Sequence, residues 1–142
     1  MKRIAPISPV IILLLFFSLI PLVGCGAPPG SQTNTFISDL KGTGAEVVMG
    51  GTVEQPYFSV AARILKVNGE EVQVFEYPYA STANTQASRV SDTGSSIGTS
   101  MISWTNTPHF FKKNGLIVLY VGRNQSILDA LKKVLGEQFA GG

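Results

Sequence analysis

The stretch Asn114-Gly115-Leu116-Ile117-Val118-Leu119-Tyr120-Val121 decides the fold of this chain. Residues 116–121 are apolar throughout, with no polar residue at alternate positions, so we expect a central strand that is covered on both faces. The Asn-Gly pair before them is a strong hairpin signal, because both central residues of a type I′ turn need a positive φ. We therefore expect a preceding strand at Phe110–Lys112.

The same pattern occurs earlier in the chain. Asn68-Gly69 lies between strands that we expect at Tyr57–Val67 and Glu71–Tyr77, and Pro56-Tyr57-Phe58 is echoed by Pro108-His109-Phe110. Residues 39–47 and 89–97 also align, each as the end of a short helix followed by a Thr-Gly turn and a strand. We interpret these echoes as a tandem helix–strand–strand–strand duplication, with chance similarity of turn chemistry as the alternative.

The remaining elements follow from local patterns. Phe36, Ile37 and Leu40 predict a short helix that ends at Gly42, and a strand should follow at Glu46–Met49. Apolar residues at helical spacing predict a second helix, which Ser81 would cap: Ala83, Ala87 and Val90. One or two strands should lie within Ile97–Trp104.

The C-terminal helix has the clearest pattern. Its apolar stripe consists of Ile127, Leu128, Leu131, Val134 and Leu135. Asn124 or Ser126 should cap its start, and Gly136 should end it. The sequence thus predicts an α+β fold, an antiparallel sheet with helices on one face. In topology it resembles small extracytoplasmic modules of tandem α-β-β-β design, such as PepSY-type domains or β-lactamase-inhibitor-like proteins.

The N-terminus has the order of an export signal. Met1-Lys2-Arg3 is positively charged, and Val10–Ile20 is an apolar run that only Ser18 interrupts. The apolar stretch from residue 10 to residue 23 has 14 residues, whereas a transmembrane helix needs about 20. A cleaved signal is therefore favoured over an uncleaved anchor.

Leu22-Val23-Gly24-Cys25 resembles the lipobox of bacterial lipoprotein precursors. The resemblance implies cleavage between Gly24 and Cys25 and a diacylglyceryl group on Cys25, with a plain secretory signal as the alternative. Residues 1–24 would then be the signal peptide, 25–35 a lipidated cysteine with a flexible tether, and 36–142 one α+β domain. Two acyl chains anchor a protein firmly to a membrane, whereas a single acyl chain binds only marginally. The protein would face the extracytoplasmic side of the cytoplasmic membrane, or reach the outer membrane if the cell has one.

Charge and cysteine content restrict the function. The net charge of +2 comes from Lys2 and Arg3, and the remaining nine Lys and Arg balance nine Asp and Glu. A neutral domain lacks the electrostatic signature of nucleic-acid binding, so we expect no nucleic-acid partner. Cys25 is the only cysteine, and lipidation would leave no thiol for a disulfide, a nucleophile or a metal. We expect no cofactor and no metal.

Two candidates for catalysis can be weighed. Asp92-Thr93-Gly94-Ser95 resembles the catalytic loop of aspartic proteases, and Val121-Gly122-Arg123-Asn124 resembles the apolar-Gly-Arg segment of retroviral-type enzymes. However, no apolar strand precedes Asp92, and only 30 residues (122 − 92) separate it from Gly122. His109 is the only histidine, so a catalytic triad would have to include it. We interpret Asp92 as a turn residue and His109 as the start of a strand.

Aromatic residues gather where strands are expected to meet loops. Tyr77, Tyr79, Trp104 and His109 form a candidate recognition patch. The sequence favours a lipid-anchored, non-catalytic binding or protein-interaction module, whose partner would be another envelope protein or a small ligand. The alternatives are a small envelope hydrolase that uses Asp92 or His109, and a structural envelope lipoprotein.

Overall fold

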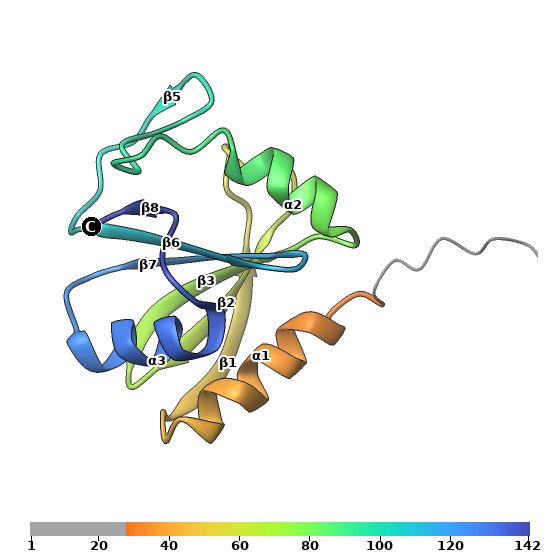
Figure 1. Ribbon diagram of the computed structural model, residues 1–142, viewed down its shortest axis with the longest axis vertical. Helices are drawn as coiled ribbons and strands as arrows, with labels where there is room; N and C mark the ends of the chain where they lie inside the picture. Colours follow the sequence, from red (N-terminus) through yellow and green to blue (C-terminus); the bar gives the residue numbers. More distant parts are fainter. Residues whose placement is uncertain (1–27) are drawn as a thin grey trace, which may run out of the picture.

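The computed structural model describes residues 28–142, which form an α+β fold with one large antiparallel sheet between helices (Figure 1). The three helices are α1 (Ser31–Gly42), α2 (Ala80–Ala87) and α3 (Gln125–Leu135). The strands are β1 (Val47–Val53), β2 (Ala62–Val67), β3 (Glu70–Glu76), β4 (Ser96–Ile97), β5 (Ser100–Met101), β6 (Pro108–Lys113), β7 (Leu116–Val121) and β8 (Ala140–Gly141). None of the helices in this part of the chain has the length and apolarity to cross a bilayer.

The central position predicted for residues 116–121 is confirmed. The strand order of the sheet is β1-β2-β3-β7-β6-β8, and every neighbouring pair is antiparallel. β7 lies between β3 and β6, and all its residues except Val121 are buried. β4 and β5 form a separate two-stranded ribbon.

The two Asn-Gly turns use their glycines differently. Asn68 and Gly69 both have a positive φ, of 49° and 85°, as a type I′ turn requires. In the second turn only Asn114 has a positive φ, of 52°. Gly115 instead provides space, because a Cβ at this position would overlap the carbonyl oxygen of Tyr77.

The duplication holds for the two long hairpins only. Asn114 follows Asn68 by 46 residues (114 − 68). Adding 46 to both numbers of the β2–β3 pair Ala62↔Phe75 gives 108 and 121, and Pro108 and Val121 are indeed paired in β6–β7. The four central strands are thus related by a pseudo-two-fold axis perpendicular to the sheet. Such an axis would keep α1 and α2 on one face, yet they lie on opposite faces. The strand that would match β1 is also missing from the second half of the sheet.

The helices cover both faces of the sheet, not one face as the sequence predicted. Phe36 of α1 and Leu131 of α3 share a core with Val118, whereas Ala83 of α2 belongs to a second core with Ile117. Alternate residues of β7 point to opposite faces, and both sets are apolar. A strand of this kind needs apolar cover on each side, and α2 supplies it on the second side.

The first helix begins at Ser31, so the segment before it is shorter than the predicted tether that ends at residue 35. Gly30, at the N-cap position, offers no side-chain cap. The carboxylate of Glu76 accepts hydrogen bonds from the backbone N–H groups of Gln32 (3.3 Å) and Thr33 (3.1 Å) instead. A negative charge at a helix N-terminus is stabilising, so β3 fixes where α1 starts.

The predicted cap of α2 is wrong, because Ser81 lies inside the helix, whose N-cap position is Tyr79 and has no side-chain cap. Val90, predicted as part of this helix, lies beyond its end at Ala87.

The ends of the C-terminal helix and the end of α1 agree with the prediction. The Asn124 side chain accepts a hydrogen bond from the backbone N–H of Ser126 (3.1 Å), which caps α3. Gly136 ends α3 with a φ of 91°, in the region that favours glycine. At α1, Gly42 is the last helical residue, as predicted.

Candidate binding groove

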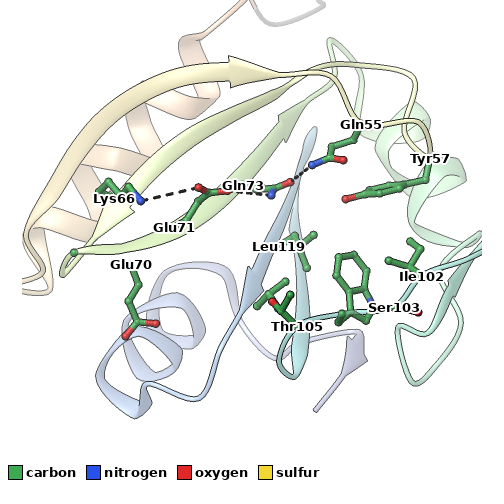
Figure 2. A pocket seen from close by; sticks show the side chains of 13 residues that line it. Gln55, Tyr57, Lys66, Glu70, Glu71, Gln73, Ile102, Ser103, Thr105 and Leu119 are labelled. Carbon is green, nitrogen blue, oxygen red and sulfur yellow. Dashed lines mark hydrogen bonds and ion pairs between the residues drawn. The ribbon is translucent and has the colours of Figure 1, made fainter.

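The α2 side of the sheet is left uncovered where β2 and β3 approach their hairpin turn, and a groove of about 520 Å³ lies there (Figure 2). We define the groove by its floor, made of Lys66, Glu71, Gln73, Leu119 and Val121, by Gln55 and Tyr57 on one wall, and by Ile102–Thr105 on the other. Its volume falls in the range of about 300–1,000 Å³ that is common for small-molecule sites.

A chain of polar contacts fixes the floor. Gln55 Nε2 donates to Gln73 Oε1 (3.0 Å), and Gln73 Nε2 donates to Glu71 Oε1 (3.2 Å). The second oxygen of Glu71 lies 4.0 Å from Lys66 Nζ. Lys66 and Glu71 are cross-strand partners, so their charges offset each other on one face. The floor therefore presents oriented amides and little net charge.

Two aromatic side chains, one from each wall, contact each other and make the groove rigid. The ring centroids of Tyr57 and Trp104 lie 6.2 Å apart in an edge-to-face arrangement. Trp104 Nε1 donates to the carbonyl oxygen of Gly94 (2.7 Å), and its ring also packs edge-to-face against Phe110. These contacts hold the Trp104 ring in one orientation.

Three hydroxyl groups remain available at the groove. Figure 2 shows the Tyr57 hydroxyl directed over the floor. Burial raises the pKa of Tyr57 to about 12, so this hydroxyl stays a neutral donor at ordinary pH. Within residues 28–142, no hydrogen bond engages the side-chain hydroxyls of Tyr57, Ser103 or Thr105. A ligand could bond to all three without breaking a contact of the fold.

The hairpin tip at the far end of the groove is tied to α3. Glu70 accepts hydrogen bonds from the Tyr120 hydroxyl (2.6 Å) and from Asn124 Nδ2 (2.9 Å). These two bonds hold the pKa of Glu70 below its ordinary value, Tyr120 contributing more than Asn124. Burial, with the contact to Glu70, raises the pKa of Tyr120. Glu70 therefore stays charged and the tip stays in place.

The recognition patch predicted from Tyr77, Tyr79, Trp104 and His109 does not form. Tyr77 is 1% exposed and His109 7% exposed, because each points into a core. Tyr79 is exposed at the start of α2, and only Trp104 lines the groove. The other predicted site residues, Gly24 and Cys25, lie outside the described residues.

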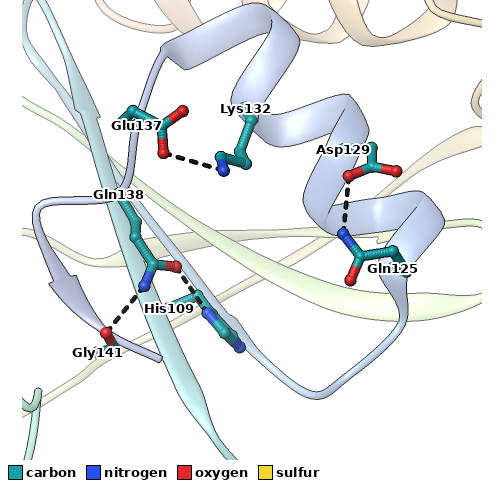
Figure 3. A network of polar contacts seen from close by, with 7 residues as sticks. All are labelled: His109, Gln125, Asp129, Lys132, Glu137, Gln138 and Gly141. Carbon is teal, nitrogen blue, oxygen red and sulfur yellow. Dashed lines mark hydrogen bonds and ion pairs between the residues drawn. The ribbon is translucent and has the colours of Figure 1, made fainter.

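His109 is held in a structural network (Figure 3). Its Nδ1 lies 2.7 Å from Gln138 Oε1, and its Nε2 lies 3.1 Å from the carbonyl oxygen of Gly122. Gln138 also donates to Gly141 of β8 (2.8 Å), and the His109 ring stacks on Tyr120. These contacts tie β8 and the loop after β7 to β6.

The residues of the hydrolase alternative are not assembled. Asp92 is exposed in a turn, and its backbone oxygen accepts from the Gly141 N–H (2.8 Å). The Ser95 hydroxyl bonds to Thr93 (2.8 Å). In residues 28–142, no hydrogen bond joins His109 to Asp92 or to a serine. The same part of the chain holds no group of three or more His, Cys, Asp or Glu that could bind a metal.

Sequence reasoning missed the amides of the floor. Glu71 and Gln73 alternate with the buried residues Val72 and Val74, which is the signal that a polar face of β3 was present. Gln55 gave no such signal, because it lies in the loop between β1 and β2. Comparison of the chain with protein-family models, curated proteins and solved structures finds no match.

Proposed function

We propose that this protein is a lipid-anchored, extracytoplasmic binding module. Its groove would hold an uncharged ligand rich in hydroxyl and amide groups, a saccharide chain of the cell envelope, without changing it chemically. The observation that carries the proposal is the groove itself, in which oriented amides, free hydroxyls and a rigid aromatic wall meet on an uncovered face of the sheet.

The chemistry of the groove supports a neutral polar ligand. A glutamine amide is both donor and acceptor, as a sugar hydroxyl or an acetamido group is, so the two complement each other. The half-buried side chains of Ile102, Trp104 and Val121 add an apolar surface that suits the C–H face of a sugar ring. Because Lys66 and Glu71 offset each other, a charged ligand would gain little from the floor.

The lipid anchor in this proposal rests on Leu22–Cys25 and the apolar run before it. Since α1 begins at Ser31, only residues 26–30 would separate the lipidated cysteine from the folded domain. Five residues span at most about 17 Å. The groove would thus work close to a membrane surface, where envelope saccharides are within reach.

The ligand is tested through Trp104, the only tryptophan in the chain. Oligomers of N-acetylhexosamine, titrated into the full-length lipoprotein in detergent, should change the Trp104 emission saturably. Gln73→Ala should weaken binding about tenfold, since it removes hydrogen bonds worth about 1 kcal/mol or more. Gln125→Ala is the matched control, because Gln125 bonds only to Asp129 on the surface of α3. An unchanged emission, or equal affinity in Gln73→Ala, would reject the ligand class.

The anchor has its own test. Cells fed labelled palmitate should incorporate the label into the wild-type chain, which should fractionate with membranes. Cys25→Ser should abolish labelling and leave the signal peptide uncleaved. A Cys25→Ser chain with the mass of the mature wild-type domain would contradict lipobox processing.

A further inference from the structure

The sheet has one long edge strand without a neighbour. β1, with seven residues, is the last strand on one side of the sheet. The strand at the other edge, β8, has only two residues. β1 reads Val-Val-Met-Gly-Gly-Thr-Val and contains no charged residue and no proline. Edge strands usually carry such residues, because unpaired backbone N–H and C=O groups invite pairing with another chain. β1 carries neither of these protections, and its one protecting feature is a bulge at mid-strand.

The side chains of β1 are also unusually exposed. Five large hydrophobic residues are exposed in residues 28–142, and three of them lie on β1: Val48 (53%), Met49 (52%) and Val53 (38%). The pairing with β2 shifts between Met49 and Thr52, which places Gly50 and Gly51 in a bulge at mid-strand. A Cβ at Gly51 would meet no atom within 4 Å, so the sheet face at Gly51 is uncovered.

We propose that β1 is the interface between two copies of this chain. The two β1 strands would pair antiparallel across a two-fold axis perpendicular to the sheet and join both sheets into one. With the axis at Gly51, Gly51 would face its own copy and Met49 would face Val53, so that apolar residues meet. The charges outside the N-terminal leader balance, which leaves no net repulsion between copies.

The start of the described chain favours a second copy over a foreign strand. Gly30 and Thr33 line a cavity of about 270 Å³ together with Met49 and Thr52, so the chain enters the domain beside β1. A two-fold axis perpendicular to the sheet keeps both α1 helices on the same face. Both chain starts would then leave that face near the axis. If the proposed lipid anchor is correct, the two anchors can enter one membrane, and confinement to it raises the local concentration of partners.

Cysteine cross-linking of the full-length chain in native membranes tests this interface. Gly51→Cys suits the backbone, because Gly51 has no positive φ and has open space around it. Opposed residues of an antiparallel pair have Cα atoms about 4.5–5.5 Å apart, which fits a disulfide. Gly51→Cys should form a disulfide-linked dimer at least about tenfold faster than Met101→Cys, a matched control on β5 that is 80% exposed.

A second variant keeps the test independent of cysteine reactivity. Met49→Lys in the Gly51→Cys background should slow dimer formation about fivefold, because it places a charge opposite Val53 on the paired edge. Thermal unfolding followed by circular dichroism should match that of the parent, since Met49 is exposed. Equal rates for Gly51→Cys and Met101→Cys, no effect of Met49→Lys, or cross-links only to another protein would each overturn the proposal.

Failure of the interface is distinguishable from failure of the proposed function. Saccharide binding is read at Trp104, on the wall of the groove and away from β1. Met49→Lys should therefore leave the Trp104 titration unchanged. If the anchor alone is wrong, a purified chain with both Cys25→Ser and Gly51→Cys should still form the dimer at high concentration in solution.

Discussion

The two faces of β2 and β3 differ sharply, and the difference explains where the groove lies. On the α1 and α3 face, the residues of these strands are fully covered: Leu65, Val67, Val72 and Val74. On the opposite face the same strands present Lys66, Glu71 and Gln73 to the groove. α2 has eight residues, about 12 Å of helix, and contacts β6 and β7. A short helix thus leaves half of one sheet face open.

The largest contrast should appear in stability. Leu131→Ala empties a fully buried position on the α1 and α3 face and should lower the free energy of unfolding by about 2–5 kcal/mol. Gln73→Ala on the groove floor should change it by at most about 0.5 kcal/mol. Urea unfolding followed by circular dichroism measures both. Comparable losses in the two variants would mean that the groove residues support the fold and not a ligand.

Two tyrosines offer a finer contrast between the two cores. The Tyr120 hydroxyl, in the core under α1 and α3, donates to Glu70 and accepts from the Asn124 N–H. Tyr120→Phe should cost about 1 kcal/mol, since it removes both hydrogen bonds of a buried side chain. The buried Tyr77 hydroxyl, in the α2 core, has no hydrogen-bond partner in residues 28–142. Tyr77→Phe should therefore be close to neutral. A greater loss from Tyr77→Phe in the same urea experiment would contradict this account.

The smallest effect concerns pH. Because hydrogen bonds lower the pKa of Glu70 from its ordinary value of 4.5, the ionised form favours the folded state. This contribution of Glu70 to the free energy of unfolding is fully present above pH 4.5. It is lost as the pH falls through the lower pKa that Glu70 has in the folded protein. Glu70→Gln should remove it, so the melting temperature of the variant should fall less than that of wild type between pH 5 and pH 3. Parallel curves for the two proteins would show that Glu70 does not contribute.

The sequence determines the elements that depend on local pattern. The apolar run of β7 and the stripe from Ile127 to Leu135 locate the central strand and the C-terminal helix, because their periodicity requires no knowledge of the tertiary fold. The start of α1 was missed, because its cap is Glu76, 43 residues from Thr33 in the sequence. The face that α2 covers was also missed, since Ala83 and Ala87 fit either side of a sheet that is apolar on both.

The site depends on register and packing, which explains why it could not be predicted. The groove brings Gln55 and Gln73 together across 18 residues, and the path of the β1–β2 loop sets their distance together with the pairing of β2 with β3. The prediction of an aromatic recognition patch was wrong for a related reason. Tyr77 and His109 have the residue type of a recognition surface, but the fold turns both into its interior. Of that patch, Trp104 alone reaches the groove.

Hydrogen exchange with and without a saturating N-acetylhexosamine oligomer tests the central claim most directly, because it shows which surface the ligand covers. We predict added protection at Ile102–Thr105, on one wall of the groove, and at Glu70–Gln73, along its floor and hairpin tip, and none along α3. Protection confined to another surface, or no change at saturation, would contradict the claim that the uncovered face of this sheet is a binding site.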